Sequence, residues 1–210
     1  MKPRRWRRKV TANRTFEYQI PKATGLWDFH LNRGRGGLPS ACENPETPYH
    51  RAHTMKIRKA KLTDAAVIAD FNARMAWETE RRRLKPETVR SGVRNLLKDP
   101  SKGRYFVAEI ERKGKRSVAG QLLITYEWSD WRNGNFCWIQ SVYVPKEFRG
   151  QGIFRALFEH VTTLARSRKD VCGLRLYVEE ENASAQRTYK RLGMNLTHYK
   201  MFETDFVLQS

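Results

Sequence analysis

The sequence predicts a mixed α/β fold, of the α+β type, with a central sheet flanked by helices. Segments with the two-residue period of strands and segments with the 3.6-residue period of helices alternate from Met55 to Phe206. One apolar strand runs directly into a loop with two glycines, and the loop opens into an amphipathic helix. Residues 1–54 keep neither period, so we expect the folded domain to begin near Met55.

A strand and two helices come first. Residues 55–60 alternate as a strand does, and apolar residues at helical spacing follow Thr63, a favourable N-cap residue, to about Trp77. A second helix has Pro86 in its first turn, where proline is tolerated, and Pro100 stops it.

Strands and helices then alternate to the end of the chain. Strands are predicted at Arg104–Glu111, Val118–Glu127, Phe136–Val144, Gly173–Val178 and Leu196–Phe206. Helices are predicted over about residues 151–168 and at Asn182–Leu192, the latter closed by Gly193 at its C′ position. A hairpin turn is expected at 113–115 and a loop at Trp128–Asn135.

The chain carries a formal charge of +19, which favours acidic partners such as nucleic acid, an anionic membrane or a phosphorylated cofactor. Lys and Arg outnumber Asp and Glu by 11 to 4 in residues 1–54 and by 30 to 18 in the remainder. The folded part is therefore basic as well. No apolar run approaches the ~18 residues of a membrane span, and the N-terminus lacks the apolar stretch of a signal peptide. We therefore expect a cytoplasmic protein without a membrane partner.

Residues 1–54 form a basic, glycine- and proline-containing leader that we expect to be poorly ordered, ahead of a domain over residues 55–208. Three interpretations compete. The leader is an inert tail or lies upstream of a true start at Met55, it is an arm that contacts nucleic acid, or it packs on the domain. The three cysteines, Cys42, Cys137 and Cys172, are expected to be free structural thiols, and no metal site is expected.

The segment from Val142 to Phe154 is the most informative stretch of the chain. Glycines at a strand-to-helix junction let the backbone approach a bulky anion, and the first free N–H groups of a helix point at that anion. The helix dipole favours negative charge at the same place. The segment is therefore interpreted as a cradle for a pyrophosphate.

Two motifs make the chain similar to the GCN5-related N-acetyltransferase (GNAT) superfamily over about residues 55–206. Arg149-Gly150-Gln151-Gly152-Ile153-Phe154 resembles the family's acyl-CoA pyrophosphate loop, with Phe154 in place of the final small residue. The run from Asn182 to Met194 resembles the family's Asn-x-x-Ala-x-x-x-Tyr-x-x-x-Gly-Phe segment.

The resemblance implies an acyltransferase that uses acetyl-CoA, held in a splay between the strands that precede the two motifs. It implies cofactor contacts from Val142, Tyr143, Val144, Arg149, Gly150, Gln151, Gly152, Ile153, Phe154, Asn182, Ala185 and Tyr189. By the same resemblance, the backbone N–H of Val144 or of a neighbour stabilises the oxyanion, and Tyr189 is the acid that protonates the leaving sulfur.

The general base is less determined by the sequence. Many family members carry a carboxylate on the strand 136–144, but here the polar residue is Gln140, which cannot take a proton. Glu127 is the first candidate because strand alternation directs it to the substrate face. Asp130, Glu78, Glu80 and a relaying water remain as alternatives.

The acceptor is expected to be an amine of a small molecule or a peptide. Candidate acceptor-binding residues are Glu78, Trp128, Trp131, Gln140 and Tyr177. Trp128 and Trp131 either line the acceptor pocket or only anchor their loop or a dimer contact. The predicted function is an N-acetyltransferase acting by direct attack in a ternary complex. The alternative is a nucleic-acid-associated or CoA-sensing protein without turnover, and a homodimer is a family-level expectation.

Overall fold

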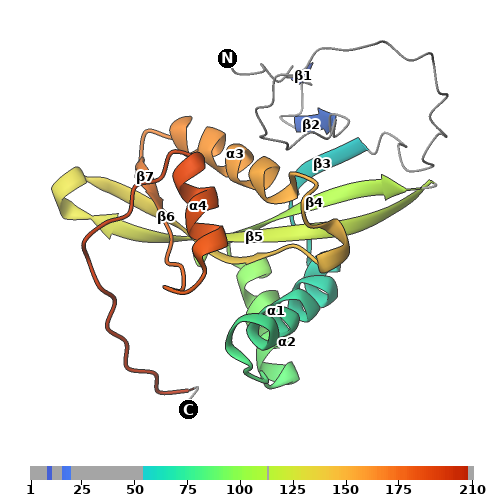
Figure 1. The fold of residues 1–210 in the computed structure, drawn as a ribbon, viewed down its shortest axis with the longest axis horizontal. Helices are drawn as coiled ribbons and strands as arrows, with labels where there is room; N and C mark the ends of the chain where they lie inside the picture. The colour runs from blue at the N-terminus through green and yellow to red at the C-terminus, as the bar shows by residue number, and fades with distance from the viewer. Residues whose placement is uncertain (1–8, 11–15, 20–53, 113, 208–210) are drawn as a thin grey trace, which may run out of the picture. The chain divides into compact units, whose positions relative to one another are not determined.

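The computed structural model of the chain describes residues 9–10, 16–19, 54–112 and 114–207. The chain divides into two units, Met1–Arg175 and Leu176–Ser210, and each is described by itself. The first unit contains a sheet whose strands lie in the order in which they follow along the chain (Figure 1). The strands are β1 (Lys9–Val10), β2 (Phe16–Gln19), β3 (Thr54–Lys59), β4 (Arg104–Arg112), β5 (Lys115–Ser129), β6 (Gly134–Tyr143) and β7 (Val171–Arg175).

The strands from β1 to β6 pair antiparallel, whereas β6 and β7 pair parallel. Antiparallel neighbours can be joined by a short turn, but a parallel pair needs a long crossover. Here the crossover carries helix α3 (Ile153–Arg166). The predicted mixed α/β fold, with a central sheet flanked by helices, is confirmed.

Helices cover both faces of the sheet in the first unit. Helices α1 (Ala65–Glu80) and α2 (Pro86–Lys98) lie on one face, and α3 lies on the other (Figure 1). Helix α2 starts with proline in its first turn, as predicted, because that position needs no N–H donor. Its last turn carries Lys98, which interacts favourably with the helix dipole.

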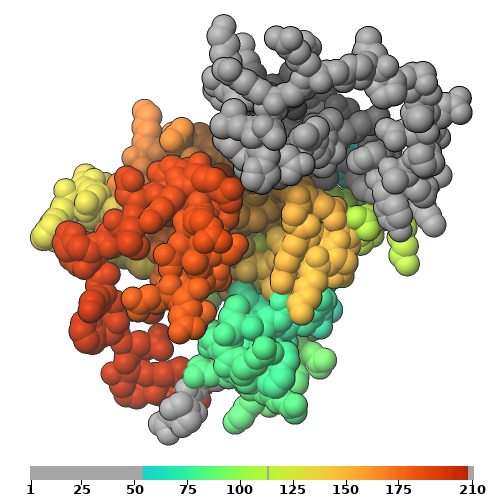
Figure 2. Space-filling model, viewed as in Figure 1, coloured from blue at the N-terminus to red at the C-terminus, as the bar shows by residue number. Residues whose placement is uncertain are grey.

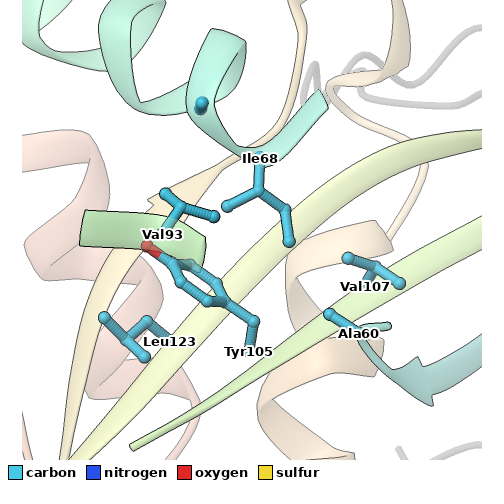
Figure 3. Packing of buried hydrophobic residues seen from close by; sticks show 7 residues of the cluster. Ala60, Ile68, Val93, Tyr105, Val107 and Leu123 are labelled. Carbon is cyan, nitrogen blue, oxygen red and sulfur yellow. The ribbon is translucent and has the colours of Figure 1, made fainter. Parts of the chain in front are cut away.

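One core cluster lies between the sheet and the helical pair α1–α2. Figure 3 shows the Tyr105 side chain extending from β4 among Leu123, Val93 and Ile68. These side chains are almost fully buried, and burying them removes apolar surface from water. A polar group in this cluster must find a hydrogen-bond partner, and the Tyr105 hydroxyl accepts one from Asn72 at 3.0 Å.

The opposite face packs against α3, which buries Ile153, Leu157 and Val161. A glycine on β5 allows the first turn of α3 to come close to the sheet. A Cβ atom at Gly120 would lie 2.8 Å from Cγ2 of Ile153 and 3.2 Å from Cγ2 of Val144. The close approach fixes the start of α3 against the sheet.

The second unit contains helix α4 (Ala183–Arg191). The Oδ1 atom of Asn182 accepts a 3.0 Å hydrogen bond from the Ala185 N–H and so caps the helix. Gly193 follows the helix with a left-handed φ of 88°, as predicted for a C′ glycine.

The structure corrects several predicted boundaries. Thr63 is not an N-cap residue, because it lies inside a short 3₁₀ turn, Leu62–Asp64, that precedes α1. Helix α3 begins at Ile153 rather than at residue 151, because Gly152 has a left-handed backbone. The predicted loop at 128–135 is shorter, since β5 reaches Ser129 and β6 starts at Gly134.

The predicted strand at 196–206 is also wrong, since the structure has no strand there. Its apolar side chains, such as Tyr199 and Phe202, are exposed. A strand-like sequence forms a strand only where a partner edge accepts its hydrogen bonds.

The N-terminal strands β1 and β2 were not predicted. The backbone of β2 pairs with β3 from Phe16–Ile57 to Gln19–Thr54, and β1 pairs with β2. Most of the predicted leader lies outside the described residues, so the interpretations of its role stay predictions. No helix in the described part of the chain is long and apolar enough to cross a membrane.

Candidate active site

The sheet opens beside β6. Strand β7 pairs with β6 from Asn135 to Trp138, and in the described part of the sheet residues 139–143 of β6 have no strand partner on that side. Exposed N–H and C=O groups on a strand edge can pair with an extended ligand. The open edge leads directly into the loop that sequence analysis interpreted as a pyrophosphate cradle.

The loop between β6 and α3 lies at the surface (Figure 2, amber). Gly150 and Gly152 both have left-handed backbones, with φ of 76° and 78°. A Cβ atom at either glycine would meet no atom of the described residues within 4 Å, so within this part of the chain the backbone faces open space. Among the described residues no side chain caps the N-terminus of α3, which leaves its first N–H groups available to an anion.

Arg149, a predicted cofactor contact, is held inside the first unit. Its Nε donates to the Val144 carbonyl at 2.8 Å, and its Nη2 donates to Glu78 Oε2 at 2.5 Å. Glu78 Oε1 accepts a 2.8 Å hydrogen bond from the Tyr143 hydroxyl. Glu78, a predicted acceptor contact and a candidate base, therefore clamps the loop onto α1. The Arg149 guanidinium holds the pKa of Glu78 below its ordinary value, which makes Glu78 a weaker base.

Two further predicted cofactor contacts, Gln151 in the loop and Phe154 in the first turn of α3, also contact other residues of the first unit. Gln151 accepts from Arg112 at 3.3 Å and donates to the Glu147 carbonyl at 3.0 Å. Phe154 is half-buried, with its ring centroid 6.1 Å from that of Phe158. The bulky residue at the last motif position thus packs along α3.

Glu127, the first candidate for the base, is half-buried on the sheet face that carries Leu123 and the helical pair. Its Oε1 accepts from Arg175 at 2.6 Å, and its Oε2 accepts from the Trp138 indole N–H. Gln140, on the same face, donates to the Thr125 hydroxyl at 2.8 Å. These residues form a row of polar side chains across β5, β6 and β7.

Trp128 and Trp131 lie at the turn between β5 and β6, with exposed fractions of 59% and 85%. Asp130 accepts a 2.8 Å hydrogen bond from the Trp131 N–H and so shapes the turn. Because both indoles are exposed, they do not anchor the turn by burial.

The remaining predicted residues lie in the second unit. The Asn182 side chain caps α4, and Ala185 supplies the N–H that it accepts from. Burial raises the pKa of Tyr189, which favours the protonated form that an acid requires. Tyr177 has an exposed fraction of 58%.

The cysteines of the described part of the chain are free. Burial raises the pKa of the Cys137 thiol, which disfavours a reactive thiolate. The described residues hold no group of three or more His, Cys, Asp or Glu that could bind a metal ion. A hollow of about 360 Å³ lies between α1 and α2, and no predicted site residue lines it.

Three side chains next to the open edge were not predicted from the sequence. Gln121 on β5 donates a hydrogen bond to the Ser141 carbonyl of β6, and it also donates to Asn72 on α1. Arg175 on β7 donates to Glu127, the first candidate for the base. The signal for Gln121 was a glutamine inside the apolar run from Val118 to Ile124. Asn72 and Arg175 gave no comparable signal, because polar residues on a helix or at a strand end are common at surfaces.

The fold and the glycine loop at the start of α3 define an acyltransferase class, and comparison with known proteins supports this. The sequence model of the acetyltransferase (GNAT) family matches residues 68–194. The chain belongs to this family.

Individual relatives agree on the class. Thialysine N-ε-acetyltransferase from Bos taurus is 36% identical over 76 residues, which cover 36% of this chain and 44% of that enzyme. The chain thus spans less than half of that relative. A possible acetyltransferase from Clostridium difficile 630 is 44% identical, with a TM-score of 0.65 over 73% of this chain and 98% of that one.

A more distant structure shares the fold. It is a predicted acetyltransferase from Clostridium acetobutylicum, solved with acetyl-CoA. It is 16% identical, with a TM-score of 0.57 over 71% of this chain and 96% of that one.

Proposed function

We propose that the protein transfers an acetyl group from acetyl-CoA to an amine of a small molecule or a peptide, by direct attack in a ternary complex. The observation that carries the proposal is the open edge of β6 at residues 139–143, followed by a glycine loop at the N-terminus of α3. An extended amide-containing arm and a pyrophosphate at its end suit these two features in this order.

The residues present fit an acyl-CoA. The backbone of Val142, Tyr143 and Val144 would pair with its amide groups. The N–H groups of Gly150 to Phe154 would hold its pyrophosphate, because no atom of the described residues lies within 4 Å of a Cβ placed at Gly150 or Gly152. Asn182 and Ala185 complete the proposed set through the second family motif. Acetyl-CoA would supply the acetyl thioester.

Three tasks then fall to the chain. A backbone N–H at the end of β6 stabilises negative charge on the thioester oxygen. Tyr189 donates a proton to the leaving sulfur, a role that its raised pKa supports. Glu127 accepts the proton from the attacking amine, directly or through a water. Its carboxylate is oriented by Arg175 and Trp138.

The acceptor would lie on the sheet face that carries Gln140 and Glu127. Glu78, Trp128, Trp131 and Tyr177 are proposed to border it. Trp128 and Trp131 are available for contact with an amine because their indoles are exposed.

A second candidate function, binding of nucleic acid, is favoured by one observation. Arg90, Arg94 and Lys98 lie exposed at four-residue spacing on α2, and none forms an ion pair with another described residue. If this function holds, RNA or DNA binding by the full chain falls steeply as salt rises. Binding that does not respond to salt would remove this candidate.

The test of the main proposal is a calorimetric titration of acetyl-CoA into the full chain. We expect one site per chain with micromolar affinity, and release of free thiol when an accepted amine is added. In Gly152→Asp, the carboxylate repels the pyrophosphate and affinity should fall by more than about tenfold, since a charge-assisted contact becomes a repulsion. Gly152→Ala is the control because it adds the same left-handed strain without charge.

The outcomes separate clearly. Equal losses in the two variants would mean that backbone strain alone explains the effect. Unchanged affinity in Gly152→Asp would refute the cradle, and a folded full chain that does not bind acetyl-CoA would refute the proposed function.

A further inference from the structure

Strand β6 contains a bulge just before the proposed cofactor-binding residues. Gln121 of β5 pairs with Tyr143, and Leu123 pairs with Gln140, so Ser141 and Val142 together oppose one residue of β5. Ser141 has a left-handed φ of 46°, which is strained for a residue other than glycine. A bulge leaves backbone groups outside the ladder and redirects them.

A chain of side-chain hydrogen bonds holds the bulge. The Nε2 atom of Gln121 donates to the Ser141 carbonyl at 3.2 Å and to Asn72 Oδ1 at 2.6 Å. Asn72 Nδ2 in turn donates to the Tyr105 hydroxyl at 3.0 Å. The Tyr105 hydroxyl also interacts with the Ser141 side chain. The chain therefore joins α1, β4 and β5 to a single residue of β6.

Packing alone does not explain why a glutamine occupies position 121. Its exposed fraction is 0%, and its Oε1 atom is buried with no hydrogen-bond partner among the described residues. A buried polar atom without a partner lowers stability, and an apolar side chain of similar size would avoid that loss. The amide N–H of Gln121 is the group that forms this contact, because it donates to the carbonyl of the strained Ser141.

Because the peptide bond after Ser141 is planar, the contact of Gln121 with the Ser141 carbonyl also sets the direction of the Val142 N–H. The peptide between Ser141 and Val142 is planar, and its C=O and N–H point in opposite directions because it is trans. Fixing the Ser141 carbonyl toward Gln121 therefore fixes the Val142 N–H in the direction away from Gln121. That N–H lies on the open stretch of β6, where the proposed thioester would be bound.

We infer that Gln121, oriented by Asn72, is a positioning residue that aims the Val142 N–H at the thioester oxygen of the acyl donor. The inference rests on the proposed function. Gln121 does not touch the reacting atoms, and it acts through the Ser141–Val142 peptide.

Gln121→Leu and Asn72→Ala test the inference in the full chain. In each, we expect kcat to fall at least about tenfold, since losing an oxyanion donor costs 10²–10³ and a misdirected one costs less. The Kd for coenzyme A without an acyl group should change less than about threefold, because it has no thioester oxygen to bind. Asp64→Asn is the control and should keep kcat within about threefold, because it weakens only the distant contacts of Asp64 with Arg58.

Amide hydrogen exchange without any ligand provides an independent readout. Exchange at residues 141–143 should be faster in Gln121→Leu than in the parent chain, and unchanged in Asp64→Asn. A folded Gln121→Leu with unchanged kcat would overturn the inference, as would parallel losses of kcat and coenzyme A affinity. If Gln121→Leu does not fold, Asn72→Ala decides by the same criteria. A parent chain without turnover would refute the proposed function, and exchange would still show whether Gln121 holds the bulge.

Discussion

Glu78 and Arg149, which are 71 residues apart in the sequence, form an ion pair of 2.5 Å between the end of α1 and the loop before α3. The Tyr143 hydroxyl binds the other carboxylate oxygen at 2.8 Å. The arginine of the phosphate-loop motif is therefore used to hold the loop itself. This leaves phosphate binding mainly to the backbone N–H groups of the loop.

Glu78→Gln should remove the ion pair while keeping an oxygen for Tyr143. We expect a loss of about 1 kcal/mol or less in the free energy of unfolding at pH 7, because the Arg149 side chain has an exposed fraction of 47% and is screened. Arg149 lowers the pKa of Glu78 below 4.5, so this stability is present above pH 4.5 and is lost as pH falls through the lowered pKa.

Urea unfolding from pH 7 to pH 3 measures this difference. The difference between the parent chain and the variant should shrink as the pH falls, because Glu78 becomes protonated and loses the ion pair. A difference that does not change with pH would show that the ion pair is not its source.

Gly120→Ala should destabilise the domain by about 1–3 kcal/mol, because the new Cβ would lie 2.8 Å from Ile153 at the start of α3. Gly92→Ala is a matched control in the interior of α2, where a Cβ meets no atom of the described part of the chain within 4 Å. The control should gain about 0.5–1 kcal/mol, since alanine favours the helix. Urea denaturation checks both, and equal effects in the two variants would contradict the close approach of α3.

Tyr189→Phe should lower kcat about 10²-fold or more if the hydroxyl is the acid, with acetyl-CoA affinity kept. Burial raises the pKa of Tyr189 above its ordinary value of 10.0, so the hydroxyl stays protonated below that pH. Steady-state rates between pH 7 and pH 9 should therefore show no loss from titration of this group. Turnover unchanged by the substitution would remove Tyr189 from the mechanism.

Glu127→Gln should lower kcat by about 10²-fold or more without changing acetyl-CoA affinity, because glutamine cannot accept the proton of the amine. Glu109→Gln is the control, since Glu109 is also a strand carboxylate paired with an arginine, Arg58 at 2.9 Å. Thiol-release kinetics for the two variants give the comparison. If both variants keep the parent rate, the base is a water or another carboxylate, with Asp130 the next to test.

Most of the fold could be predicted from the sequence, because the period of the apolar residues and the prolines and glycines that end helices act over a few residues. The two apolar periods predicted the strands β3 to β7 and the helices in order, and proline and glycine marked helix ends. The boundary errors at Thr63 and at residues 128–135 arose because a turn can be tightened or a strand extended without a clear change in pattern. The strand predicted at 196–206 failed because a strand also needs a partner.

The sequence alone determined the phosphate-loop motif, the α4 motif and the membership of the family that they imply. These features depend on backbone conformation and helix termini, which neighbouring residues specify. Only the tertiary structure decided three contacts: the ion pair of Glu127 with Arg175, the ion pair of Glu78 with Arg149, and the hydrogen bond from Gln121 to the Ser141 carbonyl. Their partners are 48, 71 and 20 residues apart, and only sheet register and helix packing bring them together.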